Sequence, residues 1–220
     1  MSACCARHGQ DELFGERAAR RSAARYRRRG ADPMARSLAR RAAARGVEGA
    51  TVLEIGGGIG QVLLELLRQG AARGEVVELV PSYEPLVGEL AAEQGVADRV
   101  SFRTADLVAD PASGSPADLV VLNKVVCCTP DGVELAGVAA SLARRSLALS
   151  HPRETRLARV VFGTVNLFLR ARRRRFRVFV HPVRELEQAV AAEGLALASE
   201  SHGPLFRVAA YERANSTSSL

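Results

Sequence analysis

Short, almost continuous apolar runs alternate with amphipathic stretches along the chain from Thr51 onwards. The apolar runs read TVLEI, EVVELV, RVSFRTA, ADLVVLN and SLALS. Such runs are typical of parallel strands that are covered on both faces. The stretches between them, GQVLLELLRQGAA, YEPLVGELAAEQG and DGVELAGVAASLARR, have apolar residues at helical spacing. This alternation predicts an α/β fold with a Rossmann-like doubly wound sheet.

Both ends of the chain depart from this alternation. Residues 12–29 and 33–46 are rich in Ala, Arg and Leu, and predict two short helices that form an N-terminal cap over residues 1–48. The last third predicts a long helix over 153–174, then FRVFVHP, a helix in VRELEQAVAAEG and an antiparallel hairpin in LALASESH and LFRVAAYER. We therefore expect three parts: the N-terminal helical cap over 1–48, a main α/β domain over 49–213, and a disordered tail over 214–220.

Length and charge limit the possible classes of protein. The chain has 220 residues, of which 47% are hydrophobic and 25% charged, enough for one α/β domain with a buried core. Its net charge of +7 comes almost entirely from arginine, and favours anionic partners such as nucleic acid, membrane headgroups or an acidic metabolite. The N-terminus lacks the apolar segment of a signal peptide, so we expect a cytoplasmic protein.

The helix expected over 153–174 combines apolar and basic character. Its apolar run VVFGTVNLFL has ten residues, about half of the roughly 20 that a transmembrane helix needs. We therefore expect no transmembrane segment. The helix fits three roles: a buried helix with a solvated basic end, a lid over a hydrophobic ligand, or an anchor at a membrane surface.

A glycine-rich loop lies between the first predicted strand and the helix that follows it. In VLEIGGGIGQVLLELL, Glu54 lies within the strand, and Gly56, Gly58 and Gly60 form the turn. Glycines allow a tight turn and a close approach of a ligand, and the following helix presents unpaired N–H groups. Such a loop suits any nucleoside or dinucleotide binder.

Two acidic residues narrow this choice. Glu78 ends the second strand, where a carboxylate accepts hydrogen bonds from both ribose hydroxyls. Asp106 follows the third strand at the same edge of the sheet, where it suits the exocyclic amine of a purine. The glycines alternate as G-x-G-x-G and are followed by Gln61 and Val62, unlike a dinucleotide fingerprint.

With these residues, the chain resembles the class I S-adenosylmethionine-dependent methyltransferases over about residues 50–212. The resemblance implies S-adenosylmethionine as cofactor, with the methionine part at the glycine loop, the ribose at Glu78 and the adenine at Asp106. The cofactor contacts expected in full are Glu54, Gly56, Gly58, Gly60, Glu78, Tyr83, Asp106, Leu107 and Asn123. Tyr83 either covers the adenosine or packs at the start of a helix. LNKVVCCTPD, SHPRETR and FRVFVHP further resemble a bacterial branch grouped with magnesium-protoporphyrin O-methyltransferases.

The methyl acceptor is expected beyond the fourth and fifth strands, where ligands collect at the carboxyl ends of an open sheet. His151 and Lys124 are the candidate catalytic residues, because a near-neutral imidazole suits removal of a proton from the acceptor. Alternatively, His151 ends the strand as a hydrogen-bonded side chain and Lys124 is solvated or forms a salt bridge. Cys127, Cys128 and Asn166 are the candidate acceptor contacts.

The paired cysteines have several interpretations. Cys127 and Cys128 are small pocket-wall residues, thiols that contact substrate or sense oxidation, or, together with Cys4 and Cys5, four thiolate ligands for zinc or a soft metalloid. Vicinal pairs lack the C-x-x-C spacing that is common in structural zinc sites, so we predict no metal.

The sequence therefore predicts an enzyme that methylates a small molecule, with oxygen favoured over nitrogen and sulfur. One alternative is a nucleic-acid methyltransferase, which the arginines would suit. However, in LNKVV the asparagine is followed by Lys124 and Val125, whereas base-amino methyltransferases usually carry Asp or Asn followed by two prolines and an aromatic. A cysteine-based metal or redox protein is a further alternative. The acceptor and the oligomeric state stay open, and peripheral membrane contact is allowed.

Overall fold

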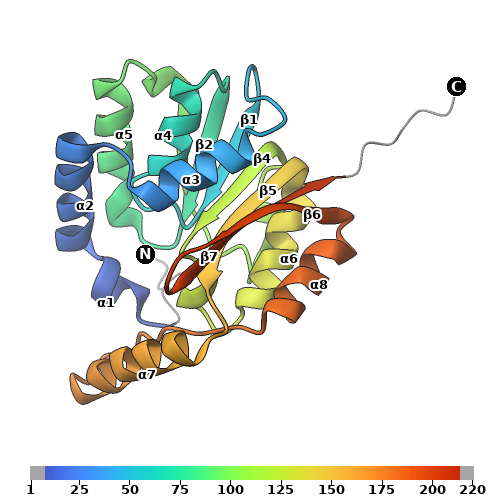
Figure 1. Ribbon diagram of the computed structural model, residues 1–220. Helices are drawn as coiled ribbons and strands as arrows, with labels where there is room; N and C mark the ends of the chain where they lie inside the picture. Colours follow the sequence, from blue (N-terminus) through green and yellow to red (C-terminus); the bar gives the residue numbers. More distant parts are fainter. Residues whose placement is uncertain (1–7, 214–220) are drawn as a thin grey trace, which may run out of the picture.

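The computed structural model describes residues 8–213, which form a seven-stranded sheet between two layers of helices (Figure 1). The strands are β1 (Thr51–Ile55), β2 (Arg73–Glu78), β3 (Val100–Thr104), β4 (Ala117–Asn123), β5 (Ala143–Pro152), β6 (Leu195–His202) and β7 (Phe206–Arg213). The helices are α1 (Gln10–Phe14), α2 (Glu16–Arg29), α3 (Pro33–Ala42), α4 (Gln61–Arg68), α5 (Glu84–Glu93), α6 (Gly132–Leu142), α7 (Arg156–Ala171) and α8 (Val183–Ala192). The tail expected over 214–220, and Cys4 and Cys5, lie outside the described residues.

The strand order is β3-β2-β1-β4-β5-β7-β6. The first five strands pair in parallel, and β7 pairs antiparallel with both β5 and β6. This confirms the predicted Rossmann-like sheet with a C-terminal antiparallel hairpin strand. The chain leaves β1 towards β2 on one side and reaches β4 on the other, so the direction of winding reverses at β1. Such a reversal opens a crevice at the carboxyl ends of the strands.

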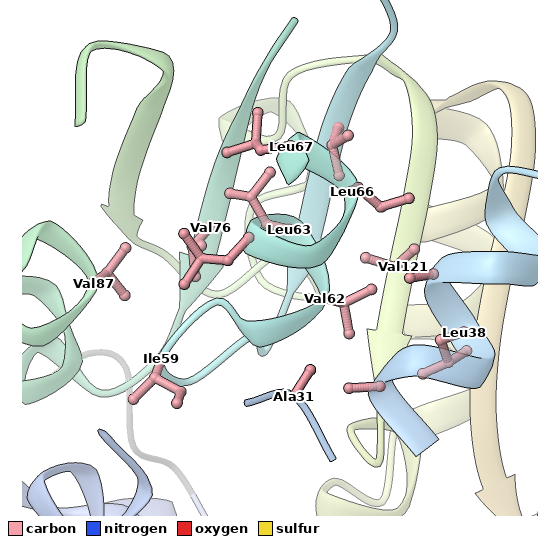
Figure 2. Packing of buried hydrophobic residues seen from close by; sticks show 14 of the residues in the cluster. Ala31, Leu38, Ile59, Val62, Leu63, Leu66, Leu67, Val76, Val87 and Val121 are labelled. Carbon is pink, nitrogen blue, oxygen red and sulfur yellow. The ribbon is translucent and has the colours of Figure 1, made fainter. Parts of the chain in front are cut away.

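The two faces of the sheet support separate cores because successive strand residues point to opposite sides. On one face, the helices α2 to α5 pack against residues such as Val52, Val76 and Val121. Figure 2 shows this core, where Val62, Leu63 and Leu66 of α4 lie among side chains from α3 and the strands. On the other face, α6 and α8 cover Leu53, Val120 and their neighbours.

Several element ends differ from the sequence prediction. The helix expected over 12–29 is divided into α1 and α2 at Gly15, whose extended backbone interrupts the helix. The helix expected to continue to Arg145 ends at Leu142, because β5 begins at Ala143. Strand β5 also continues to Pro152 instead of ending at Ser150, since β7 pairs with it over this whole length. His151 therefore belongs to the strand.

Helix α7 stands apart from the two layers, at the carboxyl edge of the sheet and close to α1 (Figure 1). Its side chain Asn166 fixes the chain that returns from the helix, because the amide donates to the Val178 carbonyl and accepts from the Val178 N–H, both at 2.8 Å. Within residues 8–213, no helix combines the length and the apolar composition needed to cross a bilayer.

Candidate active site

A cavity of about 620 Å³ lies at the carboxyl ends of β1, β2, β3 and β4. The glycine loop, the ends of the neighbouring strands and the turn that carries the cysteines form one part of its wall, and α1 and α7 contribute to the other part. The register explains this convergence, because Ile55 is paired with both Val77 and Leu122, so the three strands end together. The position matches the crevice expected at the reversal of winding.

The glycine loop has a backbone conformation and close neighbours that disfavour any residue with a side chain. Gly56, Gly58 and Gly60 have φ values of 61°, 54° and 73°, in the left-handed region that favours glycine. A Cβ on Gly58 would lie 3.3 Å from the Tyr83 ring, and one on Gly56 would lie 2.6 Å from Val125. Gly56 and Gly58 line the cavity, whereas Gly60 is the N-cap of α4 and is not part of the wall. The loop therefore presents bare backbone to a ligand.

Glu54 lies behind the glycine loop and supports it. Its side chain is fully buried, and its carboxyl oxygens accept hydrogen bonds from the backbone N–H groups of Leu63 at 2.7 Å and Val62 at 3.4 Å. Burial raises the pKa of Glu54 to about 8. Because Glu54 is not among the cavity-lining residues, the structure gives it the role of holding the first turn of α4 in place.

Glu78 connects the second strand to the glycine loop. One carboxylate oxygen accepts from the Gly58 N–H at 2.9 Å, and the other accepts from Leu79 at 2.7 Å and Val80 at 3.3 Å. Burial raises the pKa of Glu78, although these three N–H donors oppose the shift. Glu78 also lines the cavity, so this carboxylate fixes the loop and borders the ligand space.

The wall beside Glu78 contains three more of the expected cofactor contacts. Asp106, Leu107 and Tyr83 all line the cavity. The Asp106 carboxylate accepts from the Val108 and Ala109 N–H groups at 3.1 and 3.2 Å, which holds the turn after β3. Burial raises the pKa of Tyr83 to about 12, so its phenol stays neutral. Asn123, at the end of β4, also lines the cavity.

The cysteine pair lies in the short turn η4 (Val126–Cys128) after β4, and both residues line the cavity. Both thiols lie near the Lys124 carbonyl, with Sγ–O distances of 3.4 Å for Cys127 and 3.1 Å for Cys128. A hydrogen bond between the thiols lowers the pKa of Cys127 and raises that of Cys128. Among residues 8–213, no three His, Cys, Asp or Glu side chains are placed to hold a metal ion. The four-thiolate alternative needs Cys4 and Cys5, which the structure does not describe.

Lys124 lines the cavity in a left-handed conformation, with a φ of 62°. Its N–H donates to the Ser150 hydroxyl at 2.8 Å, and its ammonium group lies 3.4 Å from the Asp32 carboxylate. Asp32 and Gln61, which also line the cavity, are functional candidates that sequence reasoning missed. The Asp-Pro pair at the start of a helix indicates a helix cap at Asp32, but it gives no sign of a contact with Lys124.

The structure does not bring His151 or Asn166 to the cavity. His151 is 1% exposed, its Nδ1 lies 2.9 Å from the Pro152 carbonyl oxygen, and burial lowers its pKa to about 4. Asn166 uses its amide to hold Val178. The histidine in the cavity wall is instead His8, whose Nε2 lies 3.8 Å from the Asp131 carboxylate. Sequence reasoning missed this pair because 122 residues separate its members in the chain.

Phenylalanines surround the other part of the cavity. Phe14 and Phe176 pack edge to face with ring centroids 5.3 Å apart, and Phe162 and Phe206 do the same at 5.7 Å. The four rings come from α1, the segment after α7, α7 itself and β7. Ring edges and faces at such distances form a well-packed apolar surface. The cavity therefore has a polar part at the glycine loop and an aromatic part beside α1 and α7.

A strand-loop-helix with bare glycines, and carboxylates after the second and third strands, define a Rossmann-like enzyme that binds a nucleoside-containing cofactor. Residues 24–200 match the family described as a methyltransferase domain, and the chain belongs to this family. It is a class I methyltransferase that uses S-adenosylmethionine. The cavity fits this cofactor, because its wall contains the bare backbone of Gly56 and Gly58 and the carboxylate of Glu78.

Solved structures share the fold. The magnesium protoporphyrin IX methyltransferase of Synechocystis PCC 6803 superposes with a TM-score of 0.65 at 18% identity, over 92% of this chain and 84% of that one. An O-methyltransferase family protein of Burkholderia thailandensis has a TM-score of 0.71 at 22% identity, over 94% and 63%. An O-methyltransferase family 2 protein of Planctomyces limnophilus has a TM-score of 0.66 at 20% identity, over 91% of this chain and 62% of that one. This chain thus spans less than two thirds of the length of the last two proteins. No curated protein matches the sequence.

Proposed function

We propose that this enzyme transfers a methyl group from S-adenosylmethionine to an oxygen atom of a small, largely apolar acceptor. The single observation that carries the proposal is the division of one continuous cavity into a polar part at the glycine loop and an aromatic part between Phe162 and Phe176. A volume of about 620 Å³ lies within the ~300–1,000 Å³ typical of small-molecule sites.

The polar part suits the cofactor, which when bound supplies an electrophilic methyl group on a sulfonium. Glu78 would hold the ribose, the backbone of Gly56 and Gly58 would contact the methionine part, and Asp106 with Leu107 would border the adenine. The contacts that Glu78 makes with the loop keep this part ordered before the cofactor arrives.

The aromatic part would hold the acceptor and exclude water from it. Methyl transfer depends mainly on the alignment and desolvation of the attacking atom. His8 lies in the cavity wall, with its Nε2 3.8 Å from the Asp131 carboxylate, and is placed to take the proton of an acceptor hydroxyl, a transfer that histidine most often performs in enzymes. The preference for oxygen also draws on the neighbours in Burkholderia and Planctomyces, which are described as O-methyltransferase family proteins; the latter is in complex with apigenin.

The proposal is tested by giving the purified enzyme S-adenosylmethionine with a labelled methyl group together with an extract of the source cell. We expect the label in organic-soluble small molecules, as an ether or an ester. Alkaline hydrolysis distinguishes the two, because it releases labelled methanol only from the ester. Label in RNA or protein, or in an amine or a thioether, would contradict the proposal. Extract treated with nuclease and protease before the reaction is the control.

A further inference from the structure

Helix α7 has a second apolar face that is directed away from the cavity. Ala158, Phe162 and Leu169 are buried on its inner side, and Phe162 lines the cavity. Leu157, Val160, Leu167 and Phe168 form what we name the outer stripe, and they are 57%, 66%, 68% and 56% exposed. Of the six large hydrophobic side chains exposed within residues 8–213, five lie on α7. Such a concentration of exposed apolar side chains marks an interaction surface.

The outer stripe runs along one side of the helix, with the exposed Thr164 between Val160 and Leu167. Val160 follows Leu157 by three residues, Leu167 follows Val160 by seven, and Phe168 follows Leu157 by eleven. These intervals return to the same side of an α-helix, which has 3.6 residues per turn. Figure 1 shows that α7 lies at the edge of the molecule, apart from the helices that cover the sheet. The stripe is therefore accessible to a flat partner along its whole length.

Positive charge flanks the outer stripe. Residues 153–177 contain nine arginines and one glutamate, a net charge of +8. Arg156 and Arg170 lie on the helix beside the stripe, and Arg173 and Arg174 follow its end; none of the four is paired with a carboxylate in the described part of the chain. The Arg172 guanidinium lies 4.7 Å from the centroid of the Phe168 ring, at the end of the stripe.

We propose that the outer stripe of α7 docks onto an anionic membrane surface. Its leucine, valine and phenylalanine side chains enter the boundary between headgroups and acyl chains, and the arginines bind the phosphate groups of the lipids. An apolar helical face with a basic flank is the arrangement that lies in the plane of such an interface. A second copy of the chain fits less well, because a symmetric contact would bring the same unpaired arginines of both copies together.

Cosedimentation of the full-length protein with vesicles tests the proposal without cofactor or acceptor, so its outcome is independent of methyl transfer. We expect binding to vesicles of phosphatidylcholine with phosphatidylglycerol, at least about tenfold stronger than to phosphatidylcholine alone, and weakening as salt is added. Leu167→Gln should reduce this binding about tenfold, since it removes a leucine from the apolar contact. The matched control is Leu197→Gln on β6, where an exposed leucine lies outside the stripe, and it should bind like the wild type.

The charge contribution is tested in the same assay. Arg170→Gln with Arg173→Gln should weaken binding to the anionic vesicles, whereas Arg144→Gln, at the opposite end of β5, should not. Equal binding to both kinds of vesicle, or undiminished binding of the Leu167→Gln variant, would overturn the proposal. It would also be overturned if light scattering showed a dimer that Leu167→Gln dissociates, because the stripe would then be a contact between copies.

Discussion

The ammonium group of Lys124 lies 3.4 Å from the carboxylate of Asp32, and this ion pair joins the N-terminal helices to the wall of the active site. The second carboxylate oxygen of Asp32 accepts from the N–H groups of Met34 and Ala35, at 2.9 and 2.8 Å, and so caps α3. The Asp32 N–H donates to the side chain of Gln61 at the start of α4. One aspartate therefore fixes two helix starts beside the cavity.

Substitutions at Asp32 should distinguish the contribution of the helix cap to stability from that of the ion pair with Lys124. Asp32→Ala removes both and should lower the free energy of unfolding by about 1–2 kcal/mol. Asp32→Asn retains an oxygen for the cap and should cost less than about 1 kcal/mol, because both charged side chains are partly exposed. Urea unfolding of the two variants measures the difference. Equal losses would mean that the ion pair carries the stabilisation.

Alanine at Gly58 should destabilise the protein. The left-handed backbone at this position costs a residue with a Cβ about 1–2 kcal/mol, and the new Cβ would lie 3.3 Å from Tyr83. The matched control is Gly88→Ala within α5, where a Cβ meets no atom within 4 Å among the described residues. That change should stabilise the protein by about 0.5–1 kcal/mol. Thermal unfolding that shifts in the same direction for both variants would contradict this account of the loop.

His151 should make the stability of the protein depend on pH. Burial lowers its pKa from 6.5 to about 4, so the unfolded chain binds a proton between these values and the folded chain does not. Its contribution is complete above pH 6.5 and is lost as the pH falls towards 4, by about 3 kcal/mol in all. The difference in free energy of unfolding between wild type and His151→Gln should follow this curve. Parallel curves across this range would show that His151 titrates equally in both states.

Phe162→Leu should raise the KM for the acceptor several-fold and leave the Kd for S-adenosylmethionine unchanged, because the ring lies in the aromatic part of the cavity. Phe179→Leu is the matched control, since Phe179 stacks on His181 and is not part of the wall. Steady-state kinetics with the acceptor found in the extract experiment gives both constants. Weaker binding of S-adenosylmethionine with an unchanged KM for the acceptor would contradict this prediction, because the ring would then contact the cofactor and not the acceptor.

Local patterns were sufficient to predict which residues meet in the polar part of the cavity. The glycine loop, Glu78 and Asp106 each follow directly from a buried strand, and parallel strands bring their carboxyl ends to one edge. The same logic predicted the sheet and its terminal hairpin. These features depend on short stretches of sequence whose spatial relation is fixed by the fold class.

The aromatic part of the cavity could not be predicted in this way. Its rings belong to Phe14, Phe162, Phe176 and Phe206, which four separate elements bring together through packing that no local pattern encodes. His151 shows a related difficulty. The apolar pattern ends at Ser150, but pairing of His151 with Arg207 extends β5 by tertiary contact and removes the imidazole from the cavity.

The central claim is that the carboxylate of Glu78 and the glycine loop form the cofactor site, and calorimetric titration with S-adenosylmethionine and its demethylated product tests it most directly. We expect binding of one molecule per chain, weakened at least about tenfold in Glu78→Ala, because hydrogen bonds to a charged group contribute about 1.5–3 kcal/mol each. Glu75→Ala on the same strand, which removes only a pair with Arg103, should bind like the wild type. Absence of binding by the wild-type protein at millimolar ligand, or unchanged affinity of the Glu78→Ala variant, would contradict the account.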